Sequence, residues 1–352
     1  MGFYIPEDSN YKQHINLSAS AWTCLSDDID NFYNVPQKPN LTGFINEIFL
    51  NFHEEARASI SLRLSEYRGI YQKILSFHRP EEQDGLRSSL LESLLEQQEK
   101  ELSSHPKAEK GDYRNIRLNE KVKSCLRDSP EPPYYQNRPG KYIQSVLEEY
   151  AGLPVVQRER IVFKETLQQI HDAIDANRLL KVSSGGRILQ VLPYAVLTDK
   201  NDTFNYLTGY TEKASDDFNP ALSRPASLRL SRMTDLKILR SHRYVLTAAQ
   251  KQRLKKDIES KGIPFLIGDN TTISVRLTDN GLKQYRQQLH QRPAYISCDD
   301  QMHLMEFNCT EQQIMNYFFK FGKDAEVISP PSTRQKMAKK YQDGASAYTL
   351  IG

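Results

Sequence analysis

Apolar and polar positions near the start of the chain follow first the period of a strand and then that of two helices. Ile15 and Leu17 alternate with polar neighbours, which predicts a short, half-buried strand, and Ser18 or Ser20 can cap a helix that follows it. After the break NVPQKPN, apolar positions return at helical spacing. The helical positions are Trp22, Leu25, Ile29 and Phe32, then Leu41, Phe44, Ile45, Ile48, Phe49 and Phe52. The order is strand, helix, turn, helix.

The same order returns about a hundred residues later, as expected for an internal repeat. Five residues of the second strand and its helix match the first copy at one constant offset: Ile116, Leu118, Ser124, Cys125 and Leu126 match Ile15, Leu17, Thr23, Cys24 and Leu25. The second long helix repeats its face at Tyr142, Ile143, Val146, Leu147 and Tyr150. Chance similarity of two amphipathic segments is the alternative. Between the copies, the pattern predicts an inserted helical hairpin interrupted at Pro80 and Gly85.

This order resembles the ribbon-helix-helix family, in which two such units pair their strands into a ribbon that enters a DNA major groove. The resemblance implies that one chain carries both halves of the module. Its candidate DNA-reading positions are His14, Asn16 and Ser18 on the first strand and Asn115, Arg117 and Asn119 on the second. Arg117 is expected to be the only full positive charge on the outward face of the combined ribbon, so sequence readout is expected to be modest. A strand that merely packs in a core is the alternative.

After a helix predicted over residues 161–176, the hydrophobic pattern changes from helical to β-like. Short β-leaning runs separated by Gly, Asp, Asn and Pro predict a small, strongly bent sheet or barrel. Three steps in it, Pro193-Tyr194, Asn205-Tyr206-Leu207 and Arg229 with Arg232, resemble the WYL-domain family. Asn205 replaces the tryptophan of the family name. The resemblance implies an Sm/SH3-like β-barrel with a groove for nucleic acid or nucleotide-derived ligands.

The groove that this resemblance implies has suitable chemistry for a single strand. Tyr194 and Tyr206 can stack on bases, while Arg187, Arg229 and Arg232 can pair with phosphates. Strict alternation places Ser231 on the same strand face as Arg229. The competing interpretation is that both tyrosines are core residues and that the arginines are merely solvated.

A basic segment follows the groove residues. Nine basic residues and one acid lie between Arg229 and Lys256, although the formal net charge of the whole chain is only +3. Such clustering predicts a localised anion-binding face, here called the basic flank, at Lys237, Arg240 and Arg243. A solvated helix is the alternative for the second half of this segment.

The last hundred residues read as strand, helix, strand, helix, strand, helix. With the steps Phe321-Gly322, Ala325-Glu326-Val327 and Pro330-Pro331, they resemble the extension that follows many WYL domains and that commonly mediates dimerisation. An isolated α+β domain is the alternative. We therefore expect a multidomain α+β protein with a divided ribbon-helix-helix domain over 1–155, a WYL domain over 156–256 and a dimerisation extension over 257–352.

Composition and motifs argue against several other classes. The chain has 352 residues, 38% hydrophobic and 26% charged, which indicates globular folding. The four cysteines form no CxxC pair, and neither a leader sequence nor a membrane span is predicted, which favours a cytoplasmic protein. GxSxG, P-loop and HExxH motifs are missing from the sequence, Gly185-Gly186 reads as a hairpin turn, and the acid pairs at Asp27-Asp28 and Asp299-Asp300 read as caps or turns. We expect no enzyme activity, no cofactor and no metal site.

Taken over nearly the whole chain, these features resemble the WYL-domain accessory proteins of type VI-D CRISPR systems. The resemblance implies a homodimeric, non-catalytic regulator in antiviral defence that binds single-stranded RNA and enhances an RNA-guided, RNA-cleaving effector protein. The alternative is a transcriptional repressor that binds duplex DNA and senses a ligand with its barrel.

Overall fold

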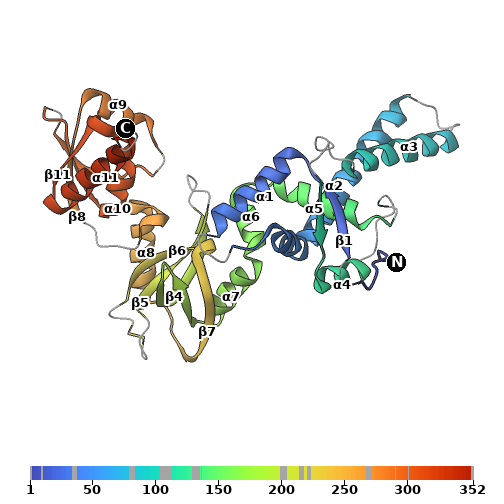
Figure 1. Ribbon diagram of the computed structural model, residues 1–352, viewed down its shortest axis with the longest axis horizontal. Helices are drawn as coiled ribbons and strands as arrows, with labels where there is room; N and C mark the ends of the chain where they lie inside the picture. The colour runs from blue at the N-terminus through green and yellow to red at the C-terminus, as the bar shows by residue number, and fades with distance from the viewer. Residues whose placement is uncertain are drawn as a thin grey trace. The chain divides into compact units, whose positions relative to one another are not determined.

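The computed structural model describes residues 2–8, 11–33, 38–78, 84–103, 113–128, 135, 137–198, 204–213, 218–219, 223–266, 271–289, 291–299 and 301–349. The chain divides into two compact units, Met1–Lys164 and Glu165–Gly352. Helices and antiparallel strands occur in both units, so the expectation of a multidomain α+β protein is confirmed (Figure 1). The finer division into three domains stays a prediction.

Unit 1 is mainly helical. Its elements are β1 (Lys12–Asn16), α1 (Ala19–Phe32), α2 (Leu41–His78), α3 (Asp84–Ser103), β2 (Tyr113–Arg117), α4 (Glu120–Asp128), α5 (Pro139–Ala151) and α6 (Val155–Val162). The distal half of α2 lies beside α3, where the Tyr71 hydroxyl donates a hydrogen bond of 3.0 Å to Gln98 (Figure 1). The predicted inserted hairpin is therefore present.

The two strands of unit 1 pair with each other. β1 and β2 form a two-stranded antiparallel sheet, called the ribbon below, with His14 opposite Asn115 and Lys12 opposite Arg117. Ile15 and Ile116, on the strands, and Leu17 and Leu118, just after them, are buried. Of the predicted helix faces, Leu41 is partly buried and the others are buried: Phe44, Ile45, Ile48, Phe49 and Phe52 of α2, and Tyr142, Ile143, Val146, Leu147 and Tyr150 of α5. The repeat thus supplies both strands of the ribbon within one chain, as its pattern predicts. The name ribbon-helix-helix stays an interpretation.

A buried ion pair joins a residue of α1 to a residue of α6. Asp28, which is fully buried, accepts hydrogen bonds from Arg158 at 2.7 and 3.0 Å and from the Tyr150 hydroxyl at 2.7 Å. Burial and the neighbouring Asp28 carboxylate raise the pKa of Tyr150, so its hydroxyl stays a donor. Because α6 carries Arg158, unit 1 extends beyond the sequence boundary at residue 155.

Unit 2 begins with a helix and a sheet. Its first elements are α7 (Lys164–Asp175), β3 (Arg178–Ser184), β4 (Arg187–Thr198), β5 (Asn205–Lys213), β6 (Arg224–Arg229), β7 (Met233–Arg243) and α8 (Ala248–Lys261). The five strands are antiparallel in the order β6-β5-β4-β3-β7, and α7 lies against them (Figure 1). The helix expected over 161–176 is confirmed from Lys164 to Asp175 by α7, whereas residues 161 and 162 belong to α6, which ends at Val162.

Two glycines form the turn of the hairpin between β3 and β4. Gly185 and Gly186 have φ of +57° and +72°, the left-handed values that a tight two-residue hairpin needs. The sequence reading of this step as a turn is confirmed. The five-stranded order is compatible with a small barrel, and the Sm/SH3-like assignment stays an interpretation.

The rest of unit 2 is a second sheet with helices. It comprises β8 (Thr271–Leu277), α9 (Asp279–Gln287), β9 (Tyr295–Asp299), β10 (Leu304–Cys309), α10 (Glu311–Phe318), β11 (Ala325–Ser329) and α11 (Pro331–Thr349), with strand order β11-β8-β10-β9. Its core includes Tyr285, Phe307, Tyr317 and Phe318. The sequence pattern missed β9, because four of its five residues are exposed and none alternates inward. Across both units, the described helices include none with the length and apolarity to cross a membrane.

Candidate nucleic-acid interface

A hollow of about 570 Å³ in unit 2 brings together three of the predicted groove residues: Tyr206, Arg229 and Arg232. We call it the arginine pocket. Its size falls within the range of about 300–1,000 Å³ that is usual for small-molecule sites. It is also lined by Ser184, Phe204, Ser227, Leu228, Pro264, Phe265, Gln291, Thr310, Gln312 and Asn316.

Arg229 is held in place within the arginine pocket. Its guanidinium lies 3.0 Å from the centre of the Phe204 ring, and its Nε donates a hydrogen bond of 2.8 Å to the Ser231 hydroxyl. The prediction that Ser231 shares a strand face with Arg229 is wrong, because β6 ends at Arg229 and residues Leu230–Arg232 form a 3-10 turn. Ser231 is buried in that turn, where its hydroxyl positions Arg229. Tyr206 lies directly opposite Arg229 in the β5–β6 pairing and is only partly buried. An aromatic ring, a fixed guanidinium and an accessible phenol are the groups that hold unstacked bases and phosphates.

The pocket also has an amide pair that sequence reasoning missed. Gln312 and Asn316 are exposed residues one turn apart on α10, and the Gln312 amide nitrogen donates a hydrogen bond of 2.7 Å to the Asn316 carbonyl oxygen. That bond leaves the Gln312 oxygen as an acceptor and the Asn316 nitrogen as a donor. An adjacent donor and acceptor match the edge of a nucleobase. Their i, i+4 spacing on an amphipathic helix was the available signal.

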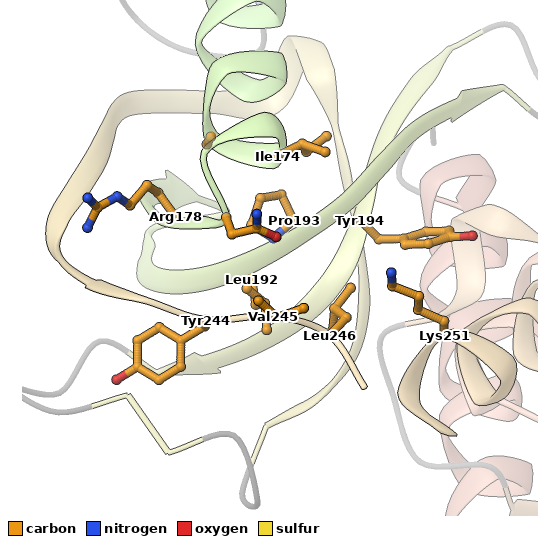
Figure 2. A pocket seen from close by; sticks show the side chains of 11 residues that line it. Ile174, Arg178, Leu192, Pro193, Tyr194, Tyr244, Val245, Leu246 and Lys251 are labelled. Atoms are coloured by element: carbon orange, nitrogen blue, oxygen red, sulfur yellow. The ribbon is translucent and has the colours of Figure 1, made fainter. Parts of the chain in front are cut away.

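Tyr194 lies in a different pocket. This second pocket, of about 120 Å³, is lined by residues that include Ile174 of α7, Leu192 and Lys251. Tyr194 and Lys251 lie at one end of it and Arg178 and Tyr244 at the other (Figure 2). The register of β4 shifts between Pro193 and Ala195, so Tyr194 is the extra residue of a bulge, which redirects its side chain. Tyr194 and Tyr206 thus line different pockets, and a shared role in RNA binding stays a prediction.

The basic flank lies along the edge strand of the five-stranded sheet. Lys237, Arg240 and Arg243 of β7 are all exposed. Lys181 of β3 is exposed directly opposite Lys237, and like charges in that position destabilise a sheet unless an anion lies nearby. Arg187 is exposed at the start of β4, opposite the pocket residue Ser184. The β3–β7 pair thus extends from the arginine pocket along a line of exposed cations.

The ribbon exposes a different set from the one the sequence suggested. His14, Asn115 and Arg117 are exposed and Asn16 partly so, in agreement with the pattern. Ser18 and Asn119 are helix caps instead: the Ser18 hydroxyl accepts from Ala21 N at 3.2 Å, and Asn119 accepts from Val122 N at 2.8 Å. These two residues lie beyond the strand ends, where alternation no longer governs direction.

Two residues that were not predicted share the outer face of the ribbon. Lys12 is exposed opposite Arg117, and Tyr113 is exposed opposite Asn16. The ribbon therefore carries two full positive charges on this face, and the expectation that Arg117 is the single one is wrong. His14 links the strands, with its ring centre 4.4 Å from that of Tyr113.

The acidic residues singled out in the sequence have structural roles. Within the described ranges, no group of three or more His, Cys, Asp or Glu side chains is arranged to hold a metal ion. Asp28 is engaged by Arg158, and Asp299 accepts hydrogen bonds from Gln301 N and Met302 N at 3.0 and 3.1 Å. These two carboxylates act as an ion-pair partner and a turn residue, while Asp300 lies outside the described residues.

Comparison with known proteins adds a fold relative. No protein-family model and no curated protein matches the chain. Among solved structures, a protein described as "a CRISPR Cas-related protein" has 21% identity and a TM-score of 0.69, with 99% of this chain and 98% of that chain covered. The proteasome accessory factor B/C (PafBC) of Arthrobacter aurescens has 14% identity and a TM-score of 0.28, with 64% of this chain and 35% of that chain covered. The first comparison shows that the whole chain shares the fold of its counterpart.

Proposed function

We propose that the protein is a non-catalytic, cytosolic regulator that binds single-stranded RNA at the arginine pocket and along the basic flank. The single observation that carries this proposal is the arrangement of Arg229, Phe204 and Tyr206 around one pocket. A single strand offers its bases for stacking and its phosphates for pairing, whereas a duplex hides its base faces. The five-stranded sheet would then be a WYL-type barrel.

The proposal includes a role in CRISPR-based antiviral defence. Support comes from the structure that shares this fold, which is described as a CRISPR Cas-related protein. On the sequence resemblance to type VI-D accessory proteins, the regulator would enhance an RNA-guided, RNA-cleaving effector protein. A test is target-RNA cleavage by such an effector with and without this protein, where an unchanged rate argues against the role.

We also propose a homodimer through the second sheet of unit 2. β9 forms one edge of that sheet, and an edge strand can pair with its own copy across a two-fold axis. Tyr295 and Ile296 on β9 are 52% and 61% exposed, and Leu289 and Met302 nearby are 60% and 55% exposed. Such exposed apolar side chains beside an edge strand favour a protein contact.

A binding titration tests the RNA proposal. Purified protein is titrated into labelled single-stranded RNA, duplex RNA and duplex DNA, and we expect the tightest binding for the single strand. Changing both Arg229→Glu and Arg232→Glu should weaken it by at least about tenfold, because two phosphate contacts become repulsive. Arg68→Glu with Lys73→Glu on α2 is the matched control, with the same change in charge on exposed residues of unit 1. Unchanged affinity in a folded pocket variant argues against the pocket.

The same titration examines a second candidate function. The outer face of the ribbon, with Lys12, His14, Asn115 and Arg117, favours contact with duplex DNA. A transcriptional repressor would bind duplex DNA more tightly than single-stranded RNA. It would also lose that binding on Lys12→Glu with Arg117→Glu and keep it on the pocket substitutions.

A further inference from the structure

Unit 1 contains a chain of contacts between a thiol, an imidazole and a phenol that RNA binding does not use. Cys125 of α4 lies with its Sγ 3.1 Å from Nε2 of His53 on α2. The other ring nitrogen of His53, Nδ1, lies 3.4 Å from the hydroxyl of Tyr142 on α5. Three helices thus converge on one imidazole.

The contacts of His53 match the tautomer that carries its proton on Nδ1. The Tyr142 hydroxyl donates to the backbone oxygen of His53 at 3.2 Å, so toward Nδ1 its oxygen acts as the acceptor. In the Nδ1-protonated tautomer, His53 donates to the Tyr142 oxygen and the lone pair of Nε2 faces the Cys125 thiol. Phe49 stacks on the ring, with centroids 5.1 Å apart and planes within 15°, and keeps it in this orientation.

Burial favours the neutral form of His53, which can accept a proton. It is 8% exposed, and burial lowers the pKa of His53, with Glu54 and Glu55 opposing and Arg57 and Lys164 assisting. A neutral imidazole beside a thiol is the arrangement that makes a cysteine nucleophilic. Cys125 itself is partly exposed, so a small reagent can reach it.

The repeat provides an internal contrast. Cys24 occupies the matching position of the first copy and is also partly exposed, but its neighbour is the Asp28 carboxylate at 3.9 Å. Burial and that carboxylate raise the pKa of Cys24 to about 11. Cys309 is buried, which raises its pKa to about 12. The thiols at the two matched positions, Cys125 and Cys24, thus have different neighbours: an imidazole and a carboxylate.

We propose that Cys125 is an activated thiol and a modification site for peroxide-class oxidants and soft electrophiles, with His53 as its base and Tyr142 as a positioning residue. With hydrogen peroxide, His53 takes the thiol proton, the sulfur attacks one oxygen, an S–O bond forms and the O–O bond breaks. The proton passes from His53 to the departing hydroxide, giving water. The sulfur is oxidised by two electrons to a sulfenic acid and the peroxide is reduced.

Modification at this position would act on the ribbon. Cys125 lies between Val122 and Leu126, which are fully buried, on the helix that directly follows β2. An added oxygen or a mixed disulfide must be accommodated between α4 and α2, because protein interiors are close-packed. Oxidation would therefore loosen α4 and, through it, the strand β2.

The full-length protein tests this with iodoacetamide at neutral pH and peptide mass mapping of each cysteine over time. We expect Cys125 to be alkylated at least about tenfold faster than Cys24, because an imidazole can accept the thiol proton as the sulfur attacks, whereas a carboxylate opposes formation of the thiolate. Dimedone trapping after hydrogen peroxide should label Cys125 first. Equal rates at the two matched positions would overturn the proposal.

Two variants separate the base from simple accessibility. In His53→Gln, the Cys125 rate should fall at least about threefold while the Cys24 rate is unchanged, since only one thiol loses its base. An unchanged Cys125 rate in a folded variant overturns the assignment. If His53→Gln does not fold, Tyr142→Phe keeps the ring packing and removes only the hydroxyl. A fall in the alkylation rate of Cys125 with no change at Cys24 supports the positioning role of Tyr142, and no fall at Cys125 overturns it.

Discussion

Residues of the same type have opposite roles in this protein because their neighbours differ. Tyr206 is partly exposed in the arginine pocket, whereas Tyr210, two steps along the same strand face, is buried and donates to the backbone of Gln250 at 3.1 Å. Alternation predicts that both share a face. It does not predict where along that face solvent begins, so sequence alone left the role of Tyr206 open.

Stacking and phosphate pairing should respond differently to salt. Arg232→Ala should reduce the slope of log K against log salt for single-stranded RNA by about one unit, because one phosphate contact is lost. Tyr206→Ala should cost about 1–3 kcal/mol of binding free energy with a nearly unchanged slope. Fluorescence titrations over a series of salt concentrations measure both, and circular dichroism checks folding. Identical slope changes in the two variants would contradict these roles.

The buried carboxylate of unit 1 should matter far more than a surface one on the same helix. Asp28→Asn leaves the Arg158 guanidinium, 11% exposed, without its countercharge, so the free energy of unfolding should fall by about 3–5 kcal/mol. Asp30→Asn is the control, because its pair with Lys38 is exposed and should contribute less than about 1 kcal/mol. Urea unfolding measures both, and similar losses would contradict the buried role.

At the scale of elements, the sequence predicted the strands, helix faces and turn that follow local rules. It missed the features that depart from a regular hydrophobic period. The ribbon strands, the faces of α2 and α5 and the Gly185-Gly186 turn follow local rules that one sequence carries. The bulge at Tyr194 depends on how β5 pairs with β4, and no local pattern signals it. β9 is held by pairing with β10 and not by a buried face of its own. Both errors arise from contacts between distant segments.

The bulge itself depends on a glycine in the neighbouring strand. A Cβ added at Gly209 would lie 2.2 Å from the backbone oxygen of Leu192, so Gly209→Ala must force β4 and β5 apart. We expect the free energy of unfolding to fall by about 1–3 kcal/mol. Gly69→Ala on α2 meets nothing within 4 Å and should stabilise the helix by up to about 1 kcal/mol. Thermal unfolding compares the two, and a neutral Gly209→Ala would contradict the close approach.

At the scale of the whole molecule, unit 1 contains every strand and ion-pair partner that its ribbon and its buried Asp28 require. Unit 1 has both strands of its ribbon and the Asp28–Arg158 pair within residues 1–164. A fragment with these bounds should fold as a monomer, whereas one ending at residue 155 lacks Arg158. Sedimentation equilibrium measures this, and a stable dimer of the 1–164 fragment would contradict a ribbon complete within one chain.

Full-length protein is expected to dimerise through β9. Ile296→Lys places a charge on the 61% exposed position of that edge strand and should convert dimers into monomers. Leu62→Lys alters a 63% exposed residue of α2 and should leave the dimer intact. Light scattering over a range of concentrations distinguishes the two. A dimer that persists in Ile296→Lys would place the contact elsewhere.

A ribbon built from two different segments of one chain changes how its surface can evolve. In a dimer of identical chains, each point mutation appears twice and the symmetry of the surface is preserved. Here a mutation alters one strand only, and the outer faces have already diverged into Lys12, His14 and Asn16 on β1 and Tyr113, Asn115 and Arg117 on β2. Selection can act on each strand separately. A target recognised by this surface is therefore under no requirement to be palindromic.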